Sequence, residues 1–304
     1  MLCFYHGGDL DGKCSGAIIK YFNPECELIP FEQGREFPWD KTRNEIVYLV
    51  DMSLPLIDMI KLSEEYASKL IWFDHHFTTT KEAKDKNFNP AGHRDPYFAA
   101  CELAWSSVAD NVIDEMMPQA VYLLGRFDVW DLKADKRIIP FQLAMKAKGM
   151  DPRYCMEDWI ELLSIGYEEG ESYENQLIDK LVEKGVAIHE YVARENRDFM
   201  NSYSIDTELD GLKVLAINRG RINSAFFESK WDNNKYDLML GFCRLNHGKD
   251  GPLWKISMYT DKPGINVGQL AKKYGDYYGL GGGGHVQAAG FVVPGNLENL
   301  PFEV

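Results

Sequence analysis

Short apolar runs alternate with helical patterns in the first quarter of the chain. The apolar runs predict strands at 2–6, 25–31, 45–51 and 69–74. The helical patterns cover 12–22 and a segment that follows Ser-Leu-Pro and ends near residue 66. Strands that alternate with helices predict βαβ units and a mainly parallel sheet buried on both faces. In such a sheet, functional groups collect at the carboxyl ends of the strands.

The second half of the chain changes character. Residues 173–202 form a long amphipathic stretch with few breakers, which predicts a helix that joins two domains. Strand-like runs follow at 210–220, 236–245 and 252–260, before a short helix around 266–274. We therefore expect an α/β protein with an N-terminal doubly wound, mainly parallel sheet, a linker helix and a smaller C-terminal α/β domain. The expected boundaries are 1–170, 171–205 and 206–304.

Composition narrows the class of protein. The 304 residues are 45% hydrophobic and 26% charged, as in an ordinary globular protein with a sizeable core. No stretch approaches the roughly 20 apolar residues that a membrane helix needs. The first apolar run is too short for a signal peptide, so we expect a cytoplasmic location and no membrane partner. The six cysteines are scattered without a Cys-x-x-Cys pair and are expected to be free thiols. Oligomeric state is left open, homodimerisation included.

The net charge limits the classes of partner that the protein is expected to bind. Lys and Arg number 33 and Asp and Glu number 47, which gives a net charge of −14. A protein that holds long duplex DNA by counterion release needs basic surface, so that class is disfavoured. Small anionic substrates remain compatible, because bound divalent cations supply positive charge locally.

Acidic residues and histidines stand where the predicted strands and one helical segment end. The set comprises His6, Asp9, Asp11, Asp51, Asp74, His75, His76, Asp128 and Asp131. Carboxylates crowded at one edge of a sheet repel one another unless cations neutralise them. Asp and His sets without Cys suit Mn²⁺ or a related divalent ion. A carboxylate that bridges two such ions belongs to the geometry that activates water and holds a phosphoryl oxygen.

Each of these features also has a purely structural interpretation. An isolated Asp-x-Asp-Gly is commonly a turn, and an Asp that ends a strand, such as Asp51, is commonly a helix N-cap. A lone buried His is usually only hydrogen-bonded, and His93 is interpreted as a structural loop histidine, with substrate contact as the alternative. Two adjacent histidines after an Asp fit that interpretation poorly. Because unpartnered buried charges are costly, the whole set favours a site.

A glycine cluster near the C-terminus is the second candidate site. Gly281 to Gly284 precede His285 and a small-residue segment. Glycines allow successive N–H groups to form a concave anion site, here expected ahead of a helix N-terminus. We expect a phosphate or nucleotide to bind at Gly282, Gly283, Gly284 and His285. The alternative is that the glycine cluster is only a flexible linker. Arg219, Arg221 and Asn223 are either helpers or plainly exposed residues.

The motifs together resemble a known family. His-Gly-Gly-Asp-Leu-Asp-Gly at 6–12, Asp51, Asp-His-His at 74–76 and Gly-Arg-Phe-Asp at 125–128 resemble the four motifs of the DHH phosphoesterase superfamily. Residues 279–291 resemble the signature of its DHH-associated C-terminal domain. The match covers essentially the full chain. Members include RecJ-type exonucleases, nanoRNases, phosphatases of 3′-phosphoadenosine 5′-phosphate, and phosphodiesterases of cyclic or linear dinucleotides.

The resemblance implies a role for each residue. The metal ligands would be His6, Asp9, Asp11, Asp51, His75 and Asp128, with Asp51 as the bridge between two ions. Asp131 would replace Asp128 if the alignment is shifted by one helical turn. His76 would face the scissile phosphate, and Asp74 would orient an imidazole. The ions would be Mn²⁺, with Mg²⁺ or Co²⁺ as alternatives.

This chain also departs from the family pattern at two positions. In many relatives the first-motif histidine stands one residue further from the Asp pair than His6 does. NanoRNase-like members tend to carry an Arg that holds a substrate phosphate in the strand that corresponds to 255–260. This chain has Tyr259 in that neighbourhood, which would stack on a base or belong to the core.

The hypothesis that follows is a metal-dependent phosphoesterase with Asp51, Asp74 and His76 in catalytic roles and Arg221 as a substrate contact. It would hydrolyse phosphodiester or phosphomonoester bonds of a short single-stranded oligonucleotide, including nanoRNA, or of a nucleotide or dinucleotide. Two alternatives remain open. A RecJ-like single-strand exonuclease would need a basic groove with stacking aromatics, and a nucleotide-binding sensor would have lost catalysis.

Overall fold

The computed structural model describes residues 1–32, 36–109, 117–164, 173–245 and 251–304. They form two compact units, Met1–His189 and Glu190–Val304, here called the N-terminal unit and the C-terminal unit. The long helix α8 (Tyr173–Tyr203) lies where the sequence predicts a joining helix, and the boundary between the units falls inside it. The domain limits at 170 and 205 stay a prediction.

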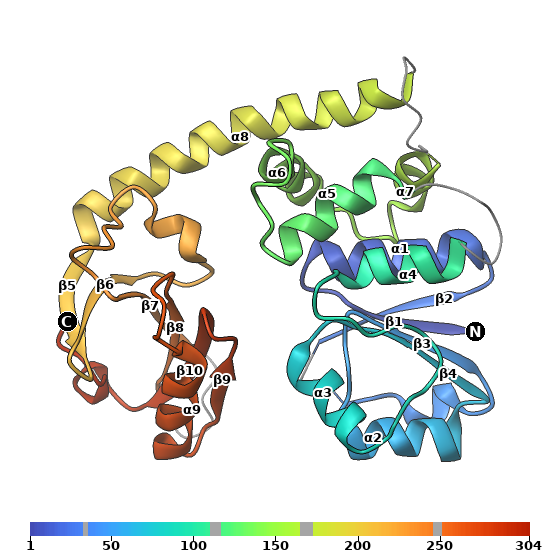
Figure 1. Cartoon of the computed structure of the whole chain (residues 1–304), viewed down its shortest axis with the longest axis horizontal. Helices are drawn as coiled ribbons and strands as arrows, with labels where there is room; N and C mark the ends of the chain where they lie inside the picture. Colours follow the sequence, from blue (N-terminus) through green and yellow to red (C-terminus); the bar gives the residue numbers. More distant parts are fainter. Residues whose placement is uncertain (33–35, 110–116, 165–172, 246–250) are drawn as a thin grey trace. The chain divides into compact units, whose positions relative to one another are not determined.

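The N-terminal unit is built on a parallel sheet (Figure 1). Its strands are β1 (Leu2–His6), β2 (Glu27–Phe31), β3 (Ile46–Val50) and β4 (Lys69–Phe73). The spatial order is β2-β1-β3-β4, and every neighbouring pair is parallel. The four strands lie at the positions that the hydrophobic pattern predicts, and the predicted parallel sheet is confirmed.

Helices cover both faces of this sheet, which explains why its strands are apolar throughout. The first face is covered by α1 (Leu10–Phe22) and α4 (Ala100–Ala109), and α5 (Gln119–Asp128), α6 (Ile138–Lys148) and α7 (Met156–Leu163) pack over these two helices on the same side. The opposite face is covered by the 3₁₀ turn η1 (Trp39–Thr42), α2 (Leu56–Lys61), the π-helical turn η2 (Leu62–Tyr66) and α3 (Phe77–Asp85). Tyr5 and Val50 face the first core and Phe4 and Leu49 the second, so alternate residues of each strand are buried on opposite sides.

The C-terminal unit contains a mixed sheet. Its strands, in spatial order, are β5 (Ile205–Leu209), β6 (Leu212–Asn218), β7 (Leu238–Leu245), β8 (Leu253–Tyr259), β10 (Ala288–Pro294) and β9 (Gly282–Gly284). Strands β6 and β7 are parallel and the other pairs antiparallel. One face packs on α9 (Val267–Tyr278), and the other packs on the 3₁₀ turn η3 (Ser224–Phe227). A last 3₁₀ turn, η4 (Leu297–Asn299), follows β10. The predicted α/β class is confirmed for both units.

The expectation of a helix after the glycine cluster is wrong. The cluster follows α9, forms the edge strand β9, and leads into β10. A Cβ atom on Gly282 would lie 2.1 Å from the Ala271 carbonyl oxygen, so the strand packs directly against α9. Gly284 has a φ of +144°, which side chains rarely adopt. Close packing and backbone conformation therefore account for these two glycines without a helix.

Among the helices that the structure describes, none is both long and apolar enough to span a bilayer.

Candidate metal centre

The register of the parallel sheet brings three predicted residues to one edge. Tyr5 pairs with Val50 and Val50 pairs with Phe73. The next residue of each strand continues this row at the carboxyl edge, and these residues are His6, Asp51 and Asp74. The backbone N–H of Asp51 donates to the Phe73 carbonyl at 2.9 Å, which extends the pairing into the site. Residues far apart in sequence thus meet where the strand ends predict.

The start of α1 adds two carboxylates to this edge. Asp9 is the N-cap of α1, and its Oδ1 accepts the Gly12 N–H at 3.0 Å. A Cβ atom on Gly12 would lie 2.2 Å from the His6 carbonyl oxygen, so glycine lets the first turn approach the end of β1. The second oxygen of Asp9 lies 3.3 Å from His6 Nε2. The Asp-x-Asp-Gly segment is therefore a helix start that also carries candidate ligands.

Asp11 is held from a second helix. Its Oδ2 accepts the Ala100 N–H at 2.9 Å, and its Oδ1 accepts the Cys101 N–H at 2.8 Å. These two donors are the first residues of α4, where helix N–H groups lack intrahelical partners and the dipole favours an anion. The carboxylate is buried and fixed against rotation. Asp11 thereby joins α1 to α4 and still faces His75.

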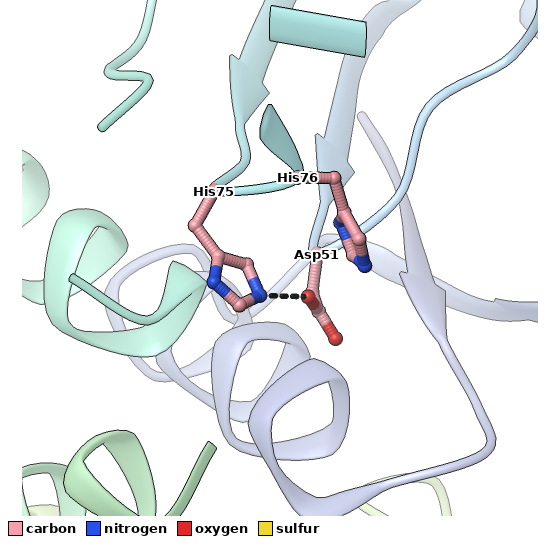
Figure 2. A group of neighbouring side chains, drawn as sticks. All are labelled: Asp51, His75 and His76. Carbon is pink, nitrogen blue, oxygen red and sulfur yellow. Dashed lines mark ion pairs between the residues drawn. The ribbon is translucent and has the colours of Figure 1, made fainter. Parts of the chain in front are cut away.

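His75 lies among three of the carboxylates, and its contact with Asp51 is drawn in Figure 2. Its Nε2 is 3.2 Å from Asp128 Oδ2, 3.3 Å from Asp51 Oδ1 and 3.7 Å from Asp11 Oδ2. Asp128 is the last residue of α5. We call the set defined by His6, Asp9, Asp11, Asp51, Asp74, His75, His76 and Asp128 the site cluster.

Asp74 orients His76. Asp74 Oδ1 lies 2.7 Å from His76 Nδ1 and accepts the backbone N–H groups of His75 and His76 at 2.8 and 3.1 Å. Its Oδ2 accepts the Trp72 indole N–H at 3.2 Å. The carboxylate is fully buried, and its hydrogen bond raises the pKa of His76. The Nε2 of His76 has no contact with Asp74 and is a hydrogen-bond donor when the ring is protonated; Figure 2 shows the ring beside Asp51.

Asp51 has the most unusual surroundings. Its φ is 54°, the left-handed region that side chains other than Gly, Asn and Asp seldom adopt, and such strain clusters at functional sites. Burial raises the pKa of Asp51 well above its ordinary value, and the charges of Asp11, Asp9 and Asp128 raise it further. Every other carboxylate of the centre therefore acts on Asp51, as expected of a group at its middle.

Neighbouring groups have shifted pKa values for the same reasons. Burial and the charge of Asp128 raise the pKa of Asp11 to about 7. Burial also raises the pKa of Asp9, against the opposing effect of His6. Burial lowers the pKa of His75, but its hydrogen bond to Asp128 and the charge of Asp11 outweigh this and raise it to about 9. The carboxylates together carry more negative charge than this imidazole neutralises.

The donor set fits divalent cations. Two groups of potential ligand atoms each lie within 4.8 Å of one another, Asp51 with His75 and His76, and Asp11 with His75 and Asp128. All donors are carboxylate oxygens or imidazole nitrogens, the set that suits Mn²⁺ and related ions. Excess buried negative charge needs such a neutraliser. His75 is common to both groups, so the two candidate positions are adjacent.

Asp128 and Asp131 have different surroundings in the structure. Asp128 contacts His75 as described, whereas Asp131 Oδ2 lies 3.7 Å from Arg126 and its side chain is half exposed. Arg126 in turn forms a two-point contact with the buried Glu102, with Nε donating to Oε1 at 3.0 Å. At the end of α5, Asp128 thus points into the site cluster, whereas Asp131 lies beside the Arg126 guanidinium.

The predicted substrate residues lie in the C-terminal unit. Gly282, Gly283 and Gly284 form β9, and the exposed His285 follows them, with its N–H donating to the Ala288 carbonyl at 2.8 Å. Arg221 is exposed in the loop after β6. Their role in binding substrate stays a prediction.

Two other candidates of the sequence have structural contacts instead. Arg219 lies over the rings of Phe199 and Phe226, at 4.6 and 4.7 Å from their centroids. Tyr259 donates its hydroxyl to the Ile222 carbonyl at 2.7 Å and packs in the core beside Phe227. Of the two roles considered for Tyr259, the core role describes its position.

Sequence reasoning missed the residues that support the centre. Trp72, the N–H groups of Ala100 and Cys101, and the Glu102–Arg126 pair hold the ligands in place. Glu102 and Arg126 stand 24 residues apart, on different helices, so no local pattern connects them. The only signal was Arg126 within the Gly-Arg-Phe-Asp motif.

Without metal, the protein is expected to lose stability as the pH rises. The native Asp11, with a pKa near 7 instead of 3.8, binds more protons than the unfolded chain between these values, so its contribution falls as pH rises. The raised pKa of His75 stabilises the fold below pH 6.5 and loses this effect as pH rises toward about 9. Differential scanning fluorimetry in EDTA should show the Tm falling by about 5 °C or more between pH 6 and 9. Mn²⁺ should restore most of this loss, and a Tm indifferent to both pH and Mn²⁺ would contradict it.

Comparisons with known proteins address the fold. No protein-family model matches the chain, and the search of curated proteins found no match. A solved DHH domain, described as a member of the s1p family of ribosomal proteins, aligns with a TM-score of 0.56 at 14% identity, over 95% of this chain and 81% of that one.

Two further solved structures are less similar. The pGpG-specific phosphodiesterase PggH from Vibrio cholerae aligns with a TM-score of 0.39 at 13% identity, over 96% of this chain and 92% of its own. Exonuclease RecJ bound to manganese aligns at 0.45 and 15% identity, over 95% and 84%. Their TM-scores lie below 0.5, so the likeness to the DHH domain is the one that bears on the fold. The chain has the fold of the DHH-domain proteins, as its motifs predict.

Proposed function

We propose that this chain is a phosphoesterase of the DHH superfamily that uses two divalent cations to hydrolyse phosphoester bonds of short oligonucleotides or dinucleotides. The observation that carries the proposal is the convergence of Asp11, Asp51 and Asp128 within 3.7 Å of one imidazole nitrogen. A structural role does not account for Asp11 and Asp51, whose pKa values are raised by burial and, in addition, by the charges of neighbouring carboxylates. Bound cations relieve that repulsion.

The residues divide into holding and donating roles. The ions would be held by His6, Asp9, Asp11, Asp51, His75 and Asp128, with Asp51 as the shared ligand, and His6 lies beside Asp9. Such ions, when bound, supply Lewis acidity toward a phosphoryl oxygen and make a nucleophile of water at neutral pH. Mn²⁺ is the ion that this mixed imidazole and carboxylate set favours, with Mg²⁺ or Co²⁺ as alternatives.

His76 would act on the substrate directly. Asp74 fixes its ring through Nδ1 and raises its pKa, which favours the protonated ring, and Nε2 of that ring would donate a hydrogen bond to a phosphoryl oxygen as charge develops there. The ring is already oriented, which avoids reorganisation during the reaction. In this role, the Nε2 of His76 would remain available to the substrate while Asp51 and His75 bind the ions.

A short substrate suits the charge of the protein. The net charge of −14 opposes long polyanions, whereas a dinucleotide brings few phosphates to a centre that the cations neutralise. In the C-terminal unit, the exposed His285 and Arg221 are the proposed contacts to the rest of the nucleotide.

Replacing His285 with Ala should raise KM about tenfold and change kcat little, since one charge-assisted hydrogen bond to substrate would be lost. Initial rates on a linear diadenylate measure both constants. His189→Ala, which alters an exposed histidine of α8, is the matched control. An unchanged KM in His285→Ala would remove His285 from the site.

A substrate panel tests the proposed function. The purified protein with Mn²⁺ would be offered a 5-mer RNA, a linear diadenylate, a cyclic dinucleotide, 3′-phosphoadenosine 5′-phosphate and a long single-stranded DNA. Chromatography with mass detection identifies the products. We expect mononucleotides from the short substrates alone. Cleavage of the long DNA alone would support a RecJ-like exonuclease, and binding without cleavage would indicate a sensor.

A further inference from the structure

Large exposed aromatic side chains adjoin the site cluster in the N-terminal unit. Trp130 is 46% exposed and stands two residues after Asp128. Phe98 is 47% exposed and stands two residues before Ala100, whose N–H holds Asp11. Two residues of chain span at most about 7 Å, so Trp130 lies close to Asp128, and Phe98 lies close to the backbone that holds Asp11.

Trp130 has a left-handed backbone conformation, which is unusual for a large side chain. Helices α6 and α9 each end on a glycine in the left-handed conformation, Gly149 with φ 75° and Gly279 with φ 69°. At the end of α5 the left-handed position is held by Trp130, with φ 62°. Glycine is the residue that this conformation favours. A large, strained, half-exposed indole there needs a reason other than helix termination.

Residues of the last turn of α5 contact both Trp130 and Phe98. The Asp131 N–H donates to the Arg126 carbonyl at 2.9 Å, which fixes the turn that carries Trp130. The ring of Trp130 packs edge-on against Phe127, with centroids 5.8 Å apart. Arg126 lies 5.6 Å from the Phe98 ring centroid and is anchored by its buried partner Glu102. The same turn thus positions Asp128, Trp130 and the cation behind Phe98.

We propose that Trp130 and Phe98 form a stacking surface for the nucleobase of the nucleoside attached to the scissile phosphate. This inference rests on the proposed function, because the site cluster fixes where that phosphate lies. Bases stack on aromatic side chains with little regard to sequence, and purines offer the larger face. The surface would therefore make the centre specific for nucleotides over other phosphoesters, and favour adenine or guanine over pyrimidines.

Trp130→Gly is the sharpest variant, because glycine suits the left-handed backbone and removes only the indole. We expect its Tm to stay within about 3 °C of the wild type. For linear diadenylate its KM should rise about tenfold or more with kcat changed less, as should that of Phe98→Ala. For the abasic dinucleotide of the same backbone, KM should not change. Tyr154→Ala, which removes an aromatic ring that is 80% exposed between α6 and α7, should behave as the wild type with both substrates.

Binding measured separately distinguishes the failure of this inference from failure of the proposed function. Calorimetric titration of diadenylate and its abasic analogue, with Ca²⁺ in place of Mn²⁺, gives Kd for each variant. Weaker diadenylate binding by Trp130→Gly supports the stacking surface even if the wild type hydrolyses nothing. Hydrolysis by the wild type with equal Kd and KM in Trp130→Gly overturns the surface and leaves the proposed function standing. A wild type that neither binds nor hydrolyses diadenylate overturns both.

Discussion

Asp51→Asn is expected to lower kcat by more than about 10³-fold, the largest effect of any single substitution in this protein. Asp51 is the carboxylate on which all the others act, and it lies 3.3 Å from His75 Nε2. The amide has nearly the same shape but no negative charge, so it would not bridge two cations. Steady-state rates on a linear dinucleotide with saturating Mn²⁺ measure the loss.

The same substitution should not damage the fold. Burial raises the pKa of Asp51 well above its usual range, so its charge destabilises the metal-free protein near neutral pH, and Asn removes that charge. In EDTA, the Tm of Asp51→Asn should therefore equal or exceed that of the wild type. Asp131→Asn is the matched control, since it changes a half-exposed carboxylate beside the same helix end. A small loss of kcat in Asp51→Asn, or an equal loss in Asp131→Asn, would refute the role of Asp51.

His76→Ala should lower kcat by about 10² to 10³-fold, because it removes a positioned donor to the charge that develops on the phosphoryl oxygens. KM should change by less than about threefold, since the interaction belongs to the transition state. Full progress curves on the same dinucleotide separate the two constants. His93→Ala, which alters an exposed histidine between α3 and α4, provides the control and should retain wild-type rates.

The pH profile distinguishes a donating His76 from a merely structural one. Asp74 raises the pKa of His76, and activity that needs the protonated ring is lost as pH rises through that raised value. In Asp74→Asn the pKa of His76 falls, so the alkaline limb should move to lower pH. An alkaline limb at the same pH in both proteins would mean that His76 does not donate in the reaction.

Much of the fold was predictable because the parallel strands are buried on both faces. Continuous apolar runs mark β1, β3 and β4, and each run ends where a charged residue can no longer be buried cheaply. Residues that end parallel strands meet at one edge, so Asp51 and the Asp74–His76 segment could be placed together from sequence. Asp128 was placed by the resemblance of its motif, since nothing in the helix pattern distinguishes it from Asp131.

The supporting contacts could not be predicted because they join residues on different helices, and no periodic pattern in the sequence marks such pairs. The donation from α4 to Asp11 needs the register of two packed helices, and so does the pairing of Glu102 with Arg126. The glycine segment misled for a related reason. Glycines are needed both for anion-binding loops and for close packing of a strand against a helix, and only the neighbour of Gly282, the Ala271 carbonyl, decides between them.

The most direct test of the central claim is the hydrolysis of a 5′-phosphorylated linear dinucleotide before and after metal removal. The protein would be stripped with EDTA, assayed, and assayed again after addition of Mn²⁺. We predict no mononucleotide from the stripped protein and full recovery once about two ions are bound per chain. Mononucleotide release that persists without metal, or dinucleotide that binds and stays intact with Mn²⁺ present, would contradict a two-cation phosphoesterase built on the site cluster.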